Sequence, residues 1–306
     1  MNFNRIYRDP VIKKIVWTCT TYCNYNCSYC PSSLHDNKHR WPSNYQSVID
    51  FINTWRKGSP VTLDILGGEP TLWPKFEQFC NDVINSSEHK TKIIFSSNGS
   101  RTLNYWRKFN AKVTNLGLSF HPEEADIDHF EAVVEELYNR YNLQIWLMLS
   151  YPHLDIVKEM YNRLEKYNID ITVYSVVDFK NKTGKITNKA EYQEFSENYS
   201  KRVQRDSVVL PYMLYKTDGV TTEPVDEQFL INSNQAAFKG WKCFVGRDTL
   251  YIQPNGDVLG SSCGASKCYG NIHNPSEINI TAEPVFCPYE YCGCGTDVEI
   301  EKVNVL

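Results

Sequence analysis

The sequence predicts an α/β fold, in which a partial (β/α)6 barrel is followed by a small cysteine-rich module. Two observations support this. Residues 12–180 alternate short runs rich in Val, Ile and Leu with amphipathic stretches, which is typical of helices packed around a buried parallel sheet. From Gly240 onward the chain is instead rich in Gly, Cys and Pro, and its strand-like runs are short.

Six strand-like runs can be identified in order, with five helical stretches between them. The strands are predicted over residues 12–20, 61–66, 92–96, 113–120, 143–150 and 169–177, and the helices over 45–57, 75–85, 103–109, 128–141 and 156–167. This alternation implies parallel strands with right-handed crossovers. Six units fit a partial, open TIM-like barrel better than a complete eight-fold one.

The second half of the chain is less regular. Residues 189–205 predict a charged, solvated helix, and residues 218–224 predict a turn or linker. Residues 250–253 and 257–259 flank Pro254-Asn255-Gly256, which favours a hairpin. We therefore expect a barrel over residues 1–180, a connecting segment over 181–240 and the cysteine-rich module over 241–306.

Composition excludes several classes of protein. The net charge of -4 gives no broad basic surface, so nucleic acid is not the expected partner. No apolar run approaches the ~18 residues of a membrane span, and the N-terminus lacks the apolar core of a signal peptide. We therefore expect no membrane partner and a cytoplasmic location.

The unusual feature is eleven cysteines. An odd count in a reducing compartment disfavours a disulfide framework, so metal binding or redox chemistry is the better interpretation. Cys19 and Cys80 stand apart and are predicted to be packed thiols. The other nine fall into two groups, which are Cys23, Cys27 and Cys30 near the start, and Cys243, Cys263, Cys268, Cys287, Cys292 and Cys294 near the end.

The first group directly follows the first predicted strand, where barrel folds place active sites. A four-iron cluster usually takes four cysteines, so three would leave one iron open for a substrate or cofactor. Taken alone, the triplet also fits zinc, with His35 or His39 as a fourth ligand. A disulfide with one spare thiol is disfavoured by the compartment.

The spacing Cys23-x3-Cys27-x2-Cys30 after the first strand resembles the signature of the radical S-adenosylmethionine (SAM) superfamily. The resemblance implies a [4Fe-4S] cluster bound by three cysteines, whose open iron is chelated by the amino and carboxylate groups of SAM. It also implies that Tyr29, the aromatic residue before the last cysteine, packs near the adenine.

Later strand ends carry further parts of the resemblance. Gly67-Gly68-Glu69-Pro70 follows the second strand and resembles the GGEP motif that binds the SAM amino group; its glycines permit close backbone approach. Ser97-Asn98 resembles the T-N-G corner of the family, with a simple Asn-Gly turn as the alternative. Ser119 has the placement of the ribose-binding Ser, and Ser150 is a weaker cofactor-binding candidate.

His121 stands where the family commonly has an acid. We expect His121 and Glu123 to line the substrate mouth. Alternatively, the acidic residues that follow His121 complement the first turn of the next helix. Asp178, at the end of the sixth strand, is a weaker candidate of the same kind.

The C-terminal cysteines resemble those of a SPASM or twitch extension, together with the segment Pro254-Asn255-Gly256-Asp257-Val258 that lies between Cys243 and Cys263. Such extensions carry auxiliary four-iron clusters. The resemblance implies at least one auxiliary [4Fe-4S] cluster, held by Cys243 and Cys263 together with two of Cys287, Cys292 and Cys294. Zinc and a second cluster remain alternatives. Cys268 is either a ligand or a thiol that donates hydrogen to a substrate radical.

The resemblance implies an enzyme that takes an electron from a flavodoxin or ferredoxin, cleaves SAM to a 5′-deoxyadenosyl radical, and abstracts hydrogen from a substrate C–H bond. The first hypothesis for the substrate is a peptide or protein, modified by crosslinking, epimerisation or oxidation. About eleven residues precede the first strand, so no leader-binding domain is expected there. The second is a small molecule such as a sugar, nucleoside or amino acid. The third, a non-catalytic iron–sulfur or zinc protein, leaves Gly67–Pro70 unexplained.

Overall fold

A computed structural model of the chain describes residues 3–9, 11–88, 90–176, 190–199, 213–225 and 227–305. Over these residues it is a mixed α/β structure with two sheets, one of nine strands and one of six. No helix in these described ranges is long and apolar enough to cross a membrane.

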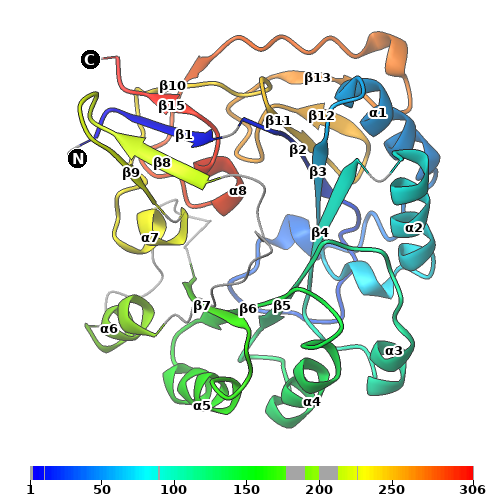
Figure 1. Cartoon of the computed structure of the whole chain (residues 1–306), viewed down its shortest axis with the longest axis vertical. Coiled ribbons are helices and arrows are strands. Elements are labelled where there is room, and N and C mark those ends of the chain that lie inside the picture. The colour runs from blue at the N-terminus through cyan, green and yellow to red at the C-terminus, as the bar shows by residue number, and fades with distance from the viewer. Residues whose placement is uncertain are drawn as a thin grey trace.

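Six parallel strands form the centre of the larger sheet and confirm the predicted parallel arrangement. They pair in chain order and are β2 (Lys13–Thr18), β3 (Val61–Leu66), β4 (Thr91–Ser97), β5 (Asn115–Phe120), β6 (Leu143–Leu149) and β7 (Asp170–Ser175). Figure 1 shows the sheet curving, with the connecting helices along its outer side.

The five connecting helices lie close to their predicted ranges. They are α1 (Gln46–Arg56), α2 (Phe76–Ser86), α3 (Leu103–Lys108), α4 (Ile127–Leu137) and α5 (Leu154–Leu164). Each of the longer ones buries one apolar face; α2, for example, buries Phe79 and Val83 against the sheet. Side-chain caps fix two of the helix starts, because Thr102 and Asp126 each accept a hydrogen bond from the backbone N–H three residues later.

The C-terminal region continues the same sheet. Strand β11 (Thr249–Ile252) pairs in parallel with β2, so that Thr249 lies opposite Lys14. Strands β12 (Asp257–Leu259) and β13 (Cys268–Asn271) then follow antiparallel. The predicted hairpin around Pro254-Asn255-Gly256 is thus confirmed.

The second sheet joins the two ends of the chain. It contains β1 (Arg5–Asp9), β8 (Met213–Thr217), β9 (Thr222–Pro224), β10 (Lys242–Cys243), β14 (Val285–Phe286) and β15 (Lys302–Val303). Figure 1 shows β1, β10 and β15 next to one another, across the sheet from α1 to α3. The sequence did not predict β1, because its partners β8 and β15 lie far along the chain.

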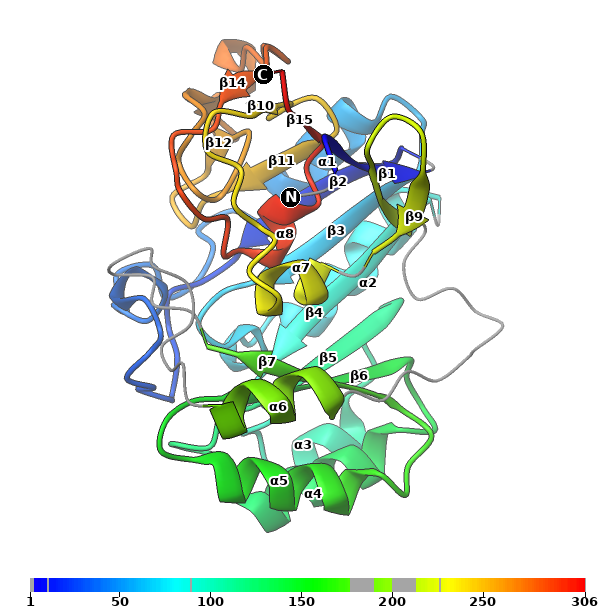
Figure 2. The same ribbon diagram turned by 90° about the vertical axis from the view of Figure 1, so that its left-hand side faces the viewer.

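Two predictions in the middle of the chain need correction. Helix α6 (Ala190–Asn198) is not fully solvated, since Tyr192 and Phe195 are buried and Phe195 packs at an angle against Tyr161 of α5. Of the turn or linker predicted over residues 218–224, residues 218–221 form the turn between β8 and β9, whereas residues 222–224 form β9 itself. The remaining helices, α7 (Glu227–Asn232) and α8 (Gly295–Val298), lie between β7 and the second sheet (Figure 2).

Candidate active site

A cavity of about 850 Å³ lies where the carboxyl ends of the parallel strands meet the C-terminal region. Each of the six strands contributes a residue at or near its last position, namely Thr18, Leu66, Ser97, Ser119, Met148 and Tyr174. This is the end of a parallel α/β sheet at which ligands bind. The volume falls within the range of small-molecule sites.

The cavity brings together the two cysteine groups. Its lining includes Cys23, Cys27 and Cys30 from the N-terminal part of the chain and Cys243, Cys263, Cys287, Cys292 and Cys294 from the C-terminal part. All eight predicted cluster ligands therefore face one space, although more than two hundred residues separate the groups in the sequence.

The loop of Cys23, Cys27 and Cys30 is held by the loop after β5. The Ser28 N–H donates to a Glu123 carboxylate oxygen at 2.6 Å, the Ser28 hydroxyl donates to the other at 2.8 Å, and the Asn26 N–H reaches Glu124 at 3.3 Å. Glu123 is thus an anchor of the cysteine loop, and it does not line the cavity.

The two glycines after β3 permit close contact with the chain that leads into the cysteine loop. The Gly68 N–H donates to the Thr20 carbonyl at 2.9 Å, and the Glu69 N–H donates to the Tyr22 carbonyl at 2.8 Å. A Cβ atom on Gly68 would lie 2.3 Å from the Tyr22 carbonyl oxygen, which no side chain could tolerate. Gly67 and Gly68 also line the cavity, so this contact places backbone at the wall of the site.

Glu69 ties the ends of β3 and β4 together. One of its oxygens accepts from Thr71 N at 3.0 Å and from Ser97 Oγ at 2.9 Å. The other oxygen accepts from Asn98 N at 2.6 Å. Burial raises the pKa of this carboxyl, and the donors oppose that effect. Glu69 is 0% exposed and, like Pro70, does not line the cavity, and its expected contact with the SAM amino group stays a prediction.

Asn98 links the β4 corner to the first cysteine. Its amide nitrogen donates to the Asn24 side chain at 3.2 Å and lies 3.8 Å from the Cys23 sulfur. Ser97, Asn98 and Ser119 all line the cavity. The polar groups expected around SAM are therefore beside the cysteine loop.

Tyr29 and His121 form a stacked pair between β5 and the cysteine loop. Their rings are 6.0 Å apart and nearly parallel at 13°, and a hydrogen bond of 2.8 Å joins the Tyr29 hydroxyl to His121 Nδ1. Burial lowers the pKa of His121 to about 4, so the ring is neutral at neutral pH. His121 lines the cavity, as predicted for a mouth residue, whereas Tyr29 lies behind it.

The thiols fit an iron–sulfur cluster as a donor set. Burial raises the pKa of Cys27 to about 12 and that of Cys30 to about 11, so binding iron must displace protons. Across the described residues, no three Cys, His, Asp or Glu side chains are arranged to hold a single metal ion. A four-iron cubane takes cysteine sulfur ligands, and eight of the eleven cysteines line this one cavity.

Asp297, which the sequence analysis missed, anchors the C-terminal cysteines. Its carboxylate accepts from the N–H of Ser262 at 3.0 Å, the Ser262 hydroxyl at 2.7 Å and the Cys263 N–H at 2.8 Å. The Ser262 hydroxyl also lies 3.3 Å from the Cys294 sulfur. An acid three residues after Cys294 gave no local signal, because its partners lie 34 and 35 residues away.

Tyrosines form much of the remaining wall and were also not predicted. Tyr174, Tyr251, Tyr289 and Tyr291 all line the cavity. The Tyr289 hydroxyl donates to the Cys263 carbonyl at 2.9 Å, and the Tyr251 hydroxyl contacts the Thr18 hydroxyl. They give the site an amphipathic surface.

Several predicted residues lie elsewhere. Cys268 is exposed on β13, bonds the Gly270 carbonyl and does not line the cavity. Ser150 is buried and contacts His153 at 3.3 Å outside the cavity lining. Cys19 and Cys80 are buried thiols, as expected. Asp178 lies outside the described residues.

Comparison with known proteins agrees with this geometry. Residues 17–124 match the family model described as Radical SAM superfamily. The chain therefore carries a radical SAM domain over the segment that contains the first cysteine loop and the Gly67–Pro70 and Ser97–Asn98 motifs, which confirms that part of the predicted resemblance.

Two curated relatives are similar at low identity. One is an S-adenosylmethionine-dependent nucleotide dehydratase of a Thermoplasmatales archaeon, 25% identical over 156 residues, which are 47% of this chain and 54% of the relative. The other is an uncharacterized protein of Methanocaldococcus jannaschii, 22% identical over 287 residues, 88% of this chain and 92% of the relative. The match thus spans about half the length of the nucleotide dehydratase.

Two solved structures share the fold. Streptococcus suis SuiB bound to precursor peptide SuiA aligns with a TM-score of 0.54 at 15% identity, covering 89% of this chain and 62% of SuiB. Native anSMEcpe with bound AdoMet and Cp18Cys peptide aligns with a TM-score of 0.57 at 14% identity, covering 88% of this chain and 80% of that chain. At these identities the likeness concerns the fold.

Proposed function

We propose that this protein is a radical SAM enzyme that abstracts hydrogen from a peptide or protein substrate. The observation that carries the proposal is the single cavity in which the radical SAM cysteine loop, the polar strand ends and a second cysteine group meet. The first group would hold a [4Fe-4S] cluster through Cys23, Cys27 and Cys30. The strand-end groups would hold SAM.

When bound, the cluster and SAM would supply a radical able to remove a hydrogen atom from a substrate C–H bond, with one electron from a flavodoxin- or ferredoxin-type donor, and with methionine and 5′-deoxyadenosine as the products of SAM. For a crosslink or an oxidation, the substrate must afterwards lose one electron and one proton.

The residues of this chain would position and shield these partners. Gly67 and Gly68 present backbone at the cavity wall, while Ser97, Asn98 and Ser119 offer polar groups for the amino acid and ribose parts of SAM. Neutral His121 closes the wall behind them without adding charge. Tyr29 would support the adenine side through its stack on His121.

The second cysteine group supports an auxiliary [4Fe-4S] cluster. Cys243 and Cys263 would be ligands together with two of Cys287, Cys292 and Cys294, all of which line the cavity. This module, which we place at residues 241–306, would face the partial barrel of residues 1–180 across the cavity, with 181–240 as the connection. An auxiliary cluster there could accept the electron released by the substrate radical. Cys268 has no part in this proposal, since it is exposed and outside the cavity.

The charge of the cavity favours a peptide over a nucleotide. Among the described residues no arginine lines it, and its two lysines are Lys38 and Lys302. Lys302 is engaged by backbone carbonyls, and Lys38 is largely exposed and pairs with Asp36 at 3.3 Å, so these two lysines offer few N–H groups for a phosphate. Phosphates are bound by basic side chains that are available to donate. The tyrosine-lined wall instead suits a side chain with apolar and polar parts.

The shared fold agrees with this choice, because SuiB and anSMEcpe are both described with bound peptides. A small-molecule substrate is the second candidate. The 25% identity to the nucleotide dehydratase over 156 residues favours it, whereas the charge of the cavity does not.

The test is turnover after anaerobic reconstitution with iron and sulfide. With dithionite and SAM, we expect 5′-deoxyadenosine to form slowly alone and faster with a mixture of unstructured peptides, with a changed peptide mass. Faster formation with nucleoside triphosphates and not with peptides would favour the small-molecule function instead. No 5′-deoxyadenosine under any condition would contradict the radical SAM assignment.

A further inference from the structure

Lys302 is a buried cation beside the second cysteine group. Its residue is 1% exposed, and its ammonium nitrogen lies 2.5 Å from the Asp297 carbonyl, 3.2 Å from the Val298 carbonyl and 2.9 Å from the Ile300 carbonyl. A neutral amine has two N–H groups, whereas three acceptors require the three donors of the charged form. The geometry therefore describes a positive charge inside the protein.

The position of this charge is set by strand pairing. In the antiparallel pair of β10 and β15, Lys302 lies directly opposite Cys243. Residues opposite each other in such a pair place their side chains on the same face and in contact range. Lys302 also lines the same cavity as Cys243, Cys287 and Cys292.

A buried charge is costly unless an opposite charge balances it. Lys14, the other lysine that is buried in the described part of the chain, has two carboxylate partners, Asp64 at 3.2 Å and Glu299 at 2.9 Å. Among the ion pairs of the described residues, none involves Lys302. Its carbonyl partners supply partial charges at the end of α8, which accounts for the contacts as a helix cap. The Asp297 carboxylate also attracts Lys302, but it forms no ion pair with it and instead accepts hydrogen bonds from Ser262 and Cys263.

We propose that Lys302 is the counter-ion of the auxiliary cluster and raises its reduction potential. This inference rests on the proposed auxiliary cluster. A cubane with four thiolate ligands carries net negative charge, and one-electron reduction adds to it. A fixed positive charge in a low-dielectric site attracts the reduced form more strongly than the oxidised form, so reduction becomes more favourable. Charge close to the cluster is among the factors that set such potentials.

The experiment measures the midpoint potential of the auxiliary cluster by EPR-monitored titration. The background is the full chain with Cys23, Cys27 and Cys30 replaced by Ala, which leaves one cluster to observe. In this background we compare Lys302→Met with Lys302→Arg and with Lys242→Met. Lys242 is the matched control, because it is adjacent to Cys243 on β10 and pairs with Val303, so its side chain leaves the opposite face of the strand.

We expect Lys302→Met to weaken reduction on the order of tenfold, which for a one-electron couple is a shift of about 59 mV to more negative potential. Lys302→Arg and Lys242→Met should stay near the parent value. If Lys302→Arg assembles the cluster and Lys302→Met does not, that result would also support the charge of Lys302 as the counter-ion of the cluster.

An unchanged potential in Lys302→Met, or an equal shift in Lys242→Met, would overturn the proposal. So would loss of the cluster in both Lys302 variants, because the cap geometry and not the charge would then be what matters. If the background protein takes up no iron at all, the auxiliary cluster itself is wrong, and that result is distinguishable from the others.

Discussion

The two cysteine groups face the same cavity but are built in different ways. The first is one short loop, Cys23 to Cys30, and its anchors come from other strand ends through Glu69, Asn98 and Glu123. The second is assembled from segments that span residues 243–294 and is anchored by Asp297 and by the pairing of β10 with β15.

This difference indicates that the two cysteine groups have different roles. A contiguous loop with three cysteines keeps its geometry when distant parts of the chain vary, and it leaves one iron position for a ligand. A site assembled from several segments depends on the fold of the whole region, and it has enough thiols for complete ligation. Substitutions in one group should therefore leave the chemistry of the other largely intact.

The largest effect expected is from the first group. Replacing Cys23, Cys27 and Cys30 by Ala should abolish 5′-deoxyadenosine formation, because no iron would remain to bind SAM. Iron content should fall from about eight to about four per chain, as four-iron clusters require. Iron analysis and chromatography of the products measure both. Cys80→Ala is the control and should retain full iron, since Cys80 is a buried thiol that does not line the cavity.

Asp297→Asn tests the second group alone. The amide keeps the shape but turns one acceptor into a donor against Ser262 and Cys263. Changes in such supporting contacts lower metal affinity by about 10–100-fold. We expect a chelator to remove half of the iron much faster than it does from the unsubstituted protein, while the SAM-dependent cluster is unaffected. Equal loss from both clusters would show that the two groups are not independent.

Glu69→Gln tests the anchor of the first group. Glutamine has one acceptor oxygen where Glu69 uses both for Thr71, Ser97 and Asn98. A buried donor left unsatisfied costs about 1–3 kcal/mol, so the free energy of unfolding should fall by about that amount and SAM cleavage should slow about tenfold. Chemical denaturation and product formation measure the two. Glu136→Gln is the control, since Glu136 of α4 forms only partly exposed ion pairs with Arg107 and Arg140; it should leave SAM cleavage unchanged and lower the free energy of unfolding by less than about 1 kcal/mol.

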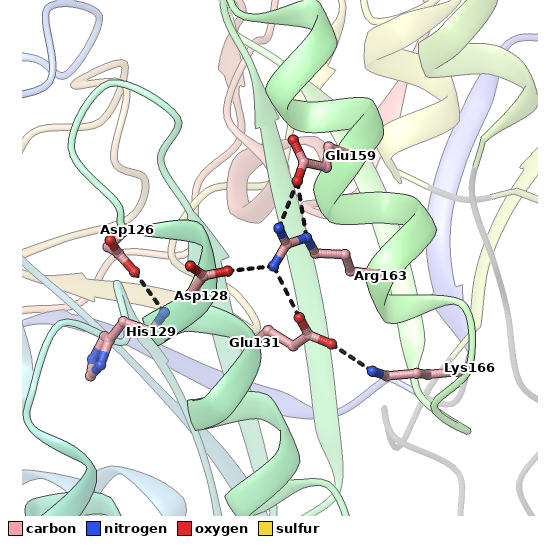
Figure 3. A network of polar contacts seen from close by, with 7 residues as sticks. All are labelled: Asp126, Asp128, His129, Glu131, Glu159, Arg163 and Lys166. Carbon is pink, nitrogen blue, oxygen red and sulfur yellow. Dashed lines mark hydrogen bonds and ion pairs between the residues drawn. The ribbon is translucent and has the colours of Figure 1, made fainter.

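The smallest effect is expected far from both groups. Arg163 of α5 pairs with Glu159 on its own helix and with Asp128 and Glu131 of α4 (Figure 3). These are partly exposed pairs on the outside of the sheet, where ion pairs contribute little. Arg163→Ala should leave iron content and SAM cleavage unchanged and lower Tm slightly. A marked loss of activity would mean that the outer helices control the cavity.

Local patterns predicted the parallel sheet and the first site well. The run at 61–66 coincides with β3, because a buried parallel strand needs a short apolar stretch and little else. The loop Cys23–Cys30 was identified because its ligands lie within eight residues of sequence. The family model over residues 17–124 agrees with both.

Contacts between distant parts of the chain could not be predicted in this way. Strand β1 pairs with β15 at the other end of the chain, and β11 joins the sheet beside β2. Asp297 and Lys302 acquire their surroundings only through such pairing. Cys268 shows the converse error, since it lies among clustered cysteines in the sequence but is exposed on β13.

The most direct test of the account is the EPR spectrum of the dithionite-reduced protein with and without SAM. We expect two cluster signals, of which one changes when SAM is added. We also expect the SAM-sensitive signal to be missing when Cys23, Cys27 and Cys30 are replaced by Ala, while the other signal remains. A spectrum that SAM does not change, or a SAM-sensitive signal that survives those replacements, would contradict it.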